Sequence, residues 1–151
     1  MNTKWMRAVA AGLAATAVMT FVGVRMAPLM GLPRMNPAEM LAGPMGDSLV
    51  LGWAGHFMVG TILALIYALV ASRLPGPTWF RGAVYSLGPW LMAQLVMMPM
   101  MGMPVFSGSA VLATGSLVGH LVYGVVLGAM YRSPTEGVVG LRQASARPVS
   151  A

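Results

Sequence analysis

The sequence has no cysteine and very few acidic residues. Without cysteine the chain has no thiolate metal ligand, no thiol nucleophile and no disulfide. Its three carboxylates belong to Glu39, Asp47 and Glu136, and none of them falls within an apolar run. We find neither paired carboxylates for acid–base chemistry nor a Ser-His-Asp arrangement, and no glycine loop carries a Walker lysine. We therefore favour a protein without enzymatic activity of its own.

Charge of either sign is scarce. Charged residues make up 8% of the 151 residues and hydrophobic ones 58%, with a mean hydropathy of +0.76, whereas a soluble domain carries about 25% charged residues. Four apolar runs approach the ~20 residues that cross a bilayer as a helix. We predict an all-α integral membrane protein with one domain, 1–132, and a flexible cytoplasmic tail, 133–151. Its four transmembrane helices are expected at about 5–27, 49–72, 79–101 and 110–131.

The net charge of +6 arises from basic residues near the predicted helix ends and in the tail. This distribution argues for the lipid bilayer, and against nucleic acid, as the partner. One side of the membrane would carry most of the positive charge, from Lys4, Arg7, Arg73, Arg81, Arg132, Arg142 and Arg147. On the other side Arg25 and Arg34 are set against Glu39 and Asp47. By the positive-inside rule both termini are predicted to be cytoplasmic.

Two octapeptides, MAPLMGLP at 26–33 and MMPMMGMP at 97–104, share the pattern M-x-P-x-M-G-x-P. The pairing extends to W-x-R and to G-H-x-x-x-G, each of which also occurs twice. The repeat predicts a four-helix bundle of two helical hairpins, related by a pseudo-two-fold axis along the membrane normal. Proline with glycine ends a helix, so each octapeptide is predicted to end a hairpin's first helix.

The N-terminal stretch also has the basic start and alanine-rich core of a cleaved signal peptide. We favour a retained helix, because the repeat gives this segment a counterpart at 79–101. In the first connection Asn36-Pro37-Ala38-Glu39 predicts a short surface helix near 37–42. Asn36 would be its N-cap, and Glu39 would close a capping box.

The two histidines of the chain, His56 and His120, hold equivalent positions in the repeat and fall inside predicted spans. Ionisable side chains within a membrane are rare and are candidates for a functional site. Small residues spaced by four share the helix face of each histidine: Gly52 and Gly60 in one helix, Ser116 and Gly124 in the other.

A structural interpretation makes the histidines interhelical hydrogen-bond glue between closely packed helices. Their partners would come from the other two helices: Thr16, Thr20, Ser86 and Gln94. The chain would then be a structural or accessory subunit, in a homo-oligomer or a larger membrane complex.

A binding interpretation places a ligand between the two imidazoles, in a binding or electron-transfer module. Bis-histidine haem b is the favoured cofactor, with Gly52, Gly60, Ser116 and Gly124 admitting the flat macrocycle. Cu(I) is the less favoured one, since it accepts imidazole and thioether ligands. Its thioether ligands would be Met30, Met97 and Met101, although methionine is also a common apolar filler. Lipid, quinone or small-solute binding stays open.

The segments WFRGAVYSLGPWLMAQLVMMPMMGMP and GHLVYGVVLGAMYR resemble the C-terminal half of the YagU-like inner-membrane proteins. AGHFMVGTILALIYALV resembles the matching earlier helix of that family, so the similarity covers most of residues 5–132. The resemblance implies a multi-pass protein of the bacterial inner membrane with a role in stress or acid tolerance. It implies no catalytic residue and assigns no role to either histidine.

Overall fold

Helices make up the fold between residues 3 and 131, the part of the chain that the computed structural model describes. No strand occurs in that range, so the predicted all-α class is confirmed. The predicted tail at 133–151 lies outside the described residues.

Two helical runs end within the octapeptides and are built alike. The first joins α1 (Thr3–Phe21) to α2 (Ala27–Leu29) through a π-helical turn, Val22–Met26. The second joins α5 (Thr78–Met92) to α6 (Met98–Met100) through the π-helical turn Ala93–Met97. Each π turn ends two residues before the first proline of its octapeptide. Proline has no N–H and its ring clashes with the preceding turn, and a local π bulge relieves that conflict.

Both octapeptides end their helix with the same hydrogen bonds. Gly31 and Gly102 adopt the left-handed conformation, with φ of 75° and 78°. The residue after each glycine donates its N–H to the carbonyl five residues earlier, Leu32 to Ala27 and Met103 to Met98, at 3.0 Å in both cases. This is the Schellman ending, which requires a residue that tolerates positive φ and is commonly followed by proline. The predicted helix-ending role of the octapeptide is confirmed.

The returning helices also begin alike. α4 spans Leu49–Val70 and α7 spans Ala110–Met130. Ser48 and Ser109 cap them, each hydroxyl accepting a hydrogen bond at 3.4 Å from the N–H three residues later. A serine in this position satisfies one of the unpaired donors of a helix start. Short 3₁₀ segments complete the connections, at Gly43–Met45, Ala71–Arg73 and Val105–Gly108.

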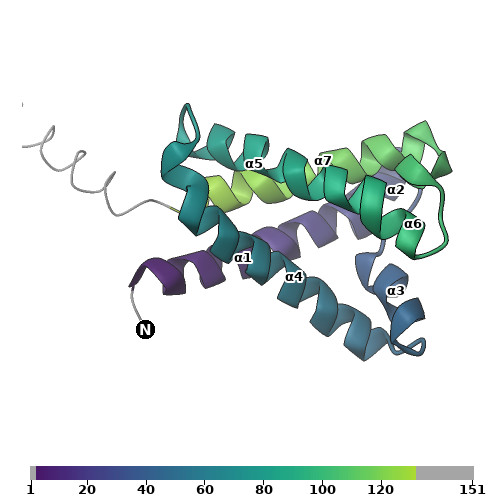
Figure 1. The fold of residues 1–151 in the computed structure, drawn as a ribbon. Helices are drawn as coiled ribbons and strands as arrows, with labels where there is room; N and C mark the ends of the chain where they lie inside the picture. Colours follow the sequence, from purple (N-terminus) through teal and green to yellow (C-terminus); the bar gives the residue numbers. More distant parts are fainter. Residues whose placement is uncertain (1–2, 132–151) are drawn as a thin grey trace, which may run out of the picture.

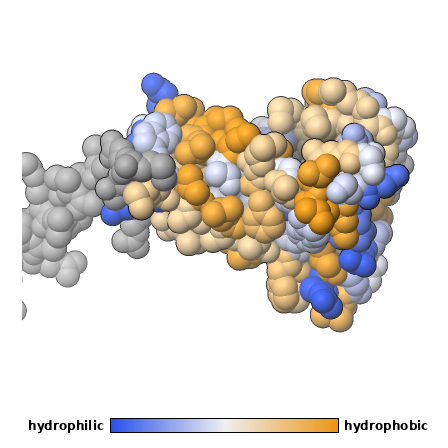
Figure 2. All heavy atoms as spheres, turned by 90° about the horizontal axis from the view of Figure 1, so that it is seen from below, coloured by the Kyte–Doolittle hydropathy of each residue, from blue (hydrophilic) through white to orange (hydrophobic). Residues whose placement is uncertain are grey.

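Three helices in the described part of the chain are long and apolar enough to cross a membrane: Lys4–Leu29, Leu49–Arg73 and Ala110–Met130. The run from Thr78 to Met100 is helical as well but is not among them, and it contains Pro89 and the polar Gln94. The predicted count of four spans is therefore not confirmed. On the face seen in Figure 2, apolar residues cover the middle and the most hydrophilic residues gather toward the two ends. This distribution fits a lipid environment.

Glycine and alanine make the closest contacts between helices. α5 lies along α7, and α1 lies against both α4 and α7 (Figure 1). Where α5 meets α7, the backbones of Gly82 and Gly124 touch, so a Cβ on either would collide with the other residue's carbonyl. In lipid, such close approach supplies the packing energy that the hydrophobic effect does not.

A two-fold axis that exchanges the hairpins would make the α4–α5 interface equivalent to the α1–α7 interface. However, α4 and α5 do not pack as closely as α1 and α7 do. Those two helices meet through aromatic side chains, with the rings of Tyr67 and Tyr85 5.2 Å apart. The predicted pseudo-two-fold relation between the hairpins is therefore not confirmed, although their helix ends match.

The short helix α3 (Pro37–Ala42) lies against the first half of α4. The Asn36 side chain accepts a hydrogen bond from the Ala38 N–H at 3.1 Å, as predicted for its N-cap. Glu39 forms an exposed ion pair with Arg34 at 3.2 Å, in place of the predicted capping box. The stability of α3 therefore depends on its N-cap and on its contact with α4.

Candidate functional site

His56, in the first half of α4, is 8% exposed and links α4 to α1. Its Nε2 lies 2.9 Å from the hydroxyl of Thr20, which itself donates to the Thr16 carbonyl at 2.7 Å. A threonine hydroxyl has one hydrogen, so the imidazole is the donor to Thr20. In the neutral ring Nδ1 is then unprotonated. Thr20 is thus confirmed as an interhelical partner of His56.

His120, in α7, forms its hydrogen bond within its own helix. Its Nδ1 lies 2.8 Å from the Ser116 carbonyl, which only accepts, so Nδ1 carries the proton and Nε2 is unprotonated in the neutral ring. Gln94, predicted as a histidine partner, donates instead to the Ser116 hydroxyl at 3.1 Å and accepts from Ser107 at 3.2 Å. Ser86 donates to the Ala83 carbonyl at 2.7 Å. Thr16 donates to the Gly12 carbonyl at 2.8 Å. These three predicted partnerships with a histidine were wrong.

A hydrogen bond from Tyr123 shows the relative depth of the two histidines along the bundle. The Tyr123 hydroxyl donates to the Gly60 carbonyl across α7 and α4, at 2.6 Å. Tyr123 follows His120 by three residues and Gly60 follows His56 by four, so the histidines lie at similar depth at about 1.5 Å rise per residue. One tyrosine side chain therefore spans the gap between α7 and α4 at the level of the two histidines. We did not predict this tyrosine, because a tyrosine in an apolar helix is also typical of a membrane interface.

Helix packing occupies the small-residue positions around the histidines. The space beside Gly60 is taken by the Thr16 hydroxyl of α1, and the space beside Gly52 by the Ala38 carbonyl of α3. Gly124 contacts Gly82 of α5 in the same way. All four positions predicted to line a macrocycle therefore contact neighbouring helical segments, Ser116 through its hydrogen bond from Gln94.

The methionines predicted as additional copper ligands belong to the octapeptide end of the molecule. Met30 and Met101 are C-cap residues of α2 and α6, and Met97 ends a π turn. His120 lies ten residues along α7 from its first residue, Ala110, which is about 15 Å. No group of three or more histidine, aspartate or glutamate side chains occurs among the residues that the structure describes. A metal site here would depend on the two imidazoles.

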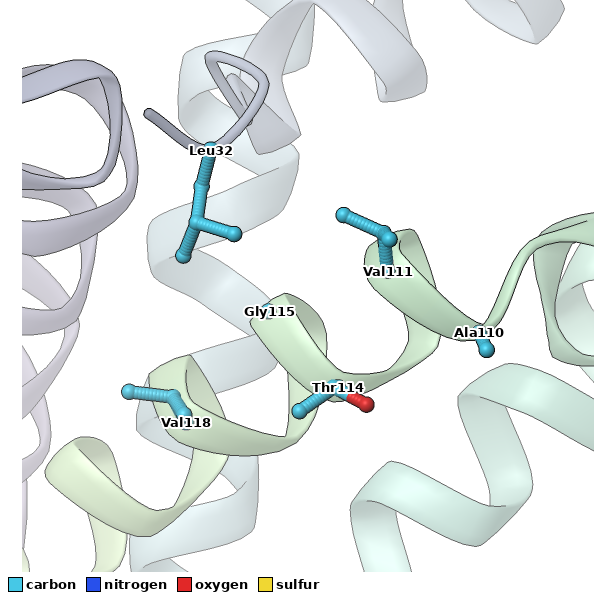
Figure 3. Close-up of a pocket in the computed structure, with 6 residues that line it drawn as sticks. All are labelled: Leu32, Ala110, Val111, Thr114, Gly115 and Val118. Atoms are coloured by element: carbon cyan, nitrogen blue, oxygen red, sulfur yellow. The ribbon is translucent and has the colours of Figure 1, made fainter. Parts of the chain in front are cut away.

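An apolar pocket of about 300 Å³ lies elsewhere, between the segment after α2 and the first turns of α7 (Figure 3). Leu32 reaches into it from that segment (Figure 3). The remaining lining comes from α7: Ala110, Val111, Thr114, Gly115 and Val118. Neither histidine belongs to this lining, so the pocket is separate from the site described above.

A protein-family model described as "Family of unknown function (DUF6789)" matches residues 2–137, and the chain belongs to that family. No curated protein and no solved structure matches the chain. The finer resemblance to YagU-like proteins stays a prediction.

Proposed function

We propose that this member of the DUF6789 family is a non-catalytic binding module of the bacterial inner membrane, with its site at His56 and His120. One observation carries the proposal. Each imidazole has one nitrogen held by a hydrogen bond, which leaves Nδ1 of His56 and Nε2 of His120 unprotonated in the neutral rings. Histidines that bind metals donate their other ring N–H in this manner, because the bond fixes the tautomer and the ring orientation.

The proposal includes a membrane topology. The segment Thr78–Met100 would be the fourth span, so that α1, α4, α5 and α7 form two hairpins around a pseudo-two-fold axis. The distribution of basic residues supports cytoplasmic termini. Haem b or Cu(I) would be the ligand, and electron transfer is the role that a bis-histidine haem supports.

A second candidate function is that of an accessory subunit, in a homo-oligomer or a larger membrane complex. The bond between His56 and Thr20 favours it, because this contact joins two helices without any ligand. On this hypothesis the histidines contribute to folding alone, as polar glue between spans.

Two substitutions separate these functions. H56Q keeps an N–H donor near the position of Nε2, and H120N keeps one near Nδ1, while each removes the unprotonated ring nitrogen. The purified wild type and both variants would be titrated separately with haemin and with Cu(I), and followed by absorbance and metal analysis. Binding by the wild type and its loss in both variants supports the binding module. A stable wild type that takes up neither ligand would support the accessory role instead.

A further inference from the structure

The histidine pair lies in a closely packed part of the bundle, and this packing restricts what it could bind. We infer that its ligand is a Cu(I) ion, coordinated by His56 Nδ1, His120 Nε2 and the thioether of Met19. This inference rests on the binding role proposed above for the two histidines.

Size is the first argument. Gly60 and Gly52 contact Thr16 and Ala38, and Gly124 contacts Gly82, so the positions expected to admit a macrocycle are filled by other helices. Buried helix backbones in contact cannot separate by the width of a porphyrin without repacking the core. A single ion requires no such opening.

Charge is the second argument. Within residues 3–131 the acidic side chains are Glu39 and Asp47, both in the connection between α2 and α4. A divalent ion between neutral imidazoles would carry two uncompensated charges into a region of low dielectric, at a large desolvation cost. Mg²⁺ and Ca²⁺ also require several oxygen ligands, and structural Zn²⁺ sites use four protein ligands. Cu(I) carries one charge and accepts imidazole and thioether donors.

Met19 is placed to supply the thioether. It directly precedes Thr20, the hydrogen-bond partner of His56, and its side chain reaches α7 at Gly119, the residue before His120. Its Cγ and Cε lie 3.7 and 3.5 Å from where a Cβ on Gly119 would be, so the sulfur between them is at the level of the pair. Met19 therefore differs from Met30 and Met97 of the octapeptide end, which are 59% and 36% exposed.

The test is a competition titration of Cu(I) against a chromogenic Cu(I) chelator, under anaerobic reducing conditions in detergent. The proteins are wild type, H56Q, H120N, M19L and M58L. Met58 is the control, since it lies on α4 two residues from His56 but is 57% exposed. We expect one Cu(I) per wild-type chain and unchanged affinity in M58L. Loss of a hydrogen-bond partner of a metal ligand alone costs about 10–100-fold in metal affinity. Loss of a histidine ligand should therefore weaken binding by about 100-fold or more, and loss of the weaker thioether ligand in M19L by about 10-fold.

Each outcome has a defined meaning. Haemin binding without Cu(I) binding would overturn this inference and leave the proposed binding function standing, whereas binding of neither ligand would overturn both. Wild-type affinity in H56Q and H120N would exclude the pair as the copper site, and wild-type affinity in M19L would exclude the thioether. If H56Q does not fold, the result with H120N alone tests the copper site. H120N is expected to fold, because the hydrogen bond of His120 lies within α7 and does not join two helices.

Discussion

Replacing Gly124 by alanine tests whether the α5–α7 interface is held by backbone contact. An added Cβ would overlap the Gly82 carbonyl oxygen and would lie 2.7 Å from both the Gly82 carbonyl carbon and the Ser86 Cβ. Ordinary contact begins near 3.4 Å, so clearing the closer carbonyl oxygen would require the helices to separate by about 1 Å. Overpacking of this kind costs ~1–3 kcal/mol. We expect G124A to be less stable by that amount than a glycine-to-alanine variant of the same helix that makes no such collision, because the helix propensity of alanine contributes equally to both.

G119A is the matched control, since Gly119 lies in the same helix and is also buried. There the added Cβ would make ordinary contact with Met19, at 3.5 Å. We expect G119A to leave stability unchanged or to raise it by up to about 1 kcal/mol, from helix propensity alone. Denaturant unfolding in detergent, followed by circular dichroism, measures both variants. Equal stability of G124A and G119A would refute the argument from backbone contact.

Three further predictions concern other contacts and the topology. T20V removes the acceptor of the His56 N–H and should destabilise the bundle by ~0.6–2 kcal/mol in detergent unfolding; no change would mean that the bond is not made. N36A removes the cap of α3 and should cost ~0.5–2 kcal/mol locally, seen as faster amide exchange confined to 36–42, and unaltered exchange would contradict the cap. In the cysteine-free chain, S72C should react with a membrane-impermeant thiol reagent only from the cytoplasmic side and E39C only from the opposite side. Labelling of both from one side would refute the topology.

The ends of the helices were the part of the fold most open to prediction, because local chemistry decides them. The proline and glycine of M-x-P-x-M-G-x-P correspond to fixed positions of a Schellman ending. Asn36 before Pro37 likewise defined the start of α3. The π turns before Pro28 and Pro99 were not predicted, since the sequence shows that a proline must be accommodated but not by which distortion.

The packing of helices on one another was less predictable. The resemblance of the two hairpins suggested equivalent contacts, yet α1 packs closely on α7 while α4 and α5 meet through tyrosines. Glu39 had both a capping box and Arg34 within reach, and only the path of the connection selects Arg34. Gly60 and Gly124 were identified as small-residue positions, but what fills the space beside each depends on the neighbouring helix.

The candidate site was predictable as a pair of residue types but not in its details. Repetition of G-H-x-x-x-G identified both histidines as equivalent, and Thr20 was correctly predicted as a partner. The pairing of His120 with the Ser116 carbonyl was missed, since that bond depends on a side-chain rotamer within α7. Which ring nitrogen is unprotonated follows from these bonds, so the sequence alone could not specify it.

X-ray absorption at the copper edge of the Cu(I)-loaded protein tests the histidine pair most directly, because it reports the ligand atoms themselves. Coordination by His56, His120 and Met19 predicts two imidazole nitrogens and one sulfur around each copper. A spectrum with sulfur scatterers alone would place the metal among methionines such as those of the octapeptides, and would contradict a site between the two histidines.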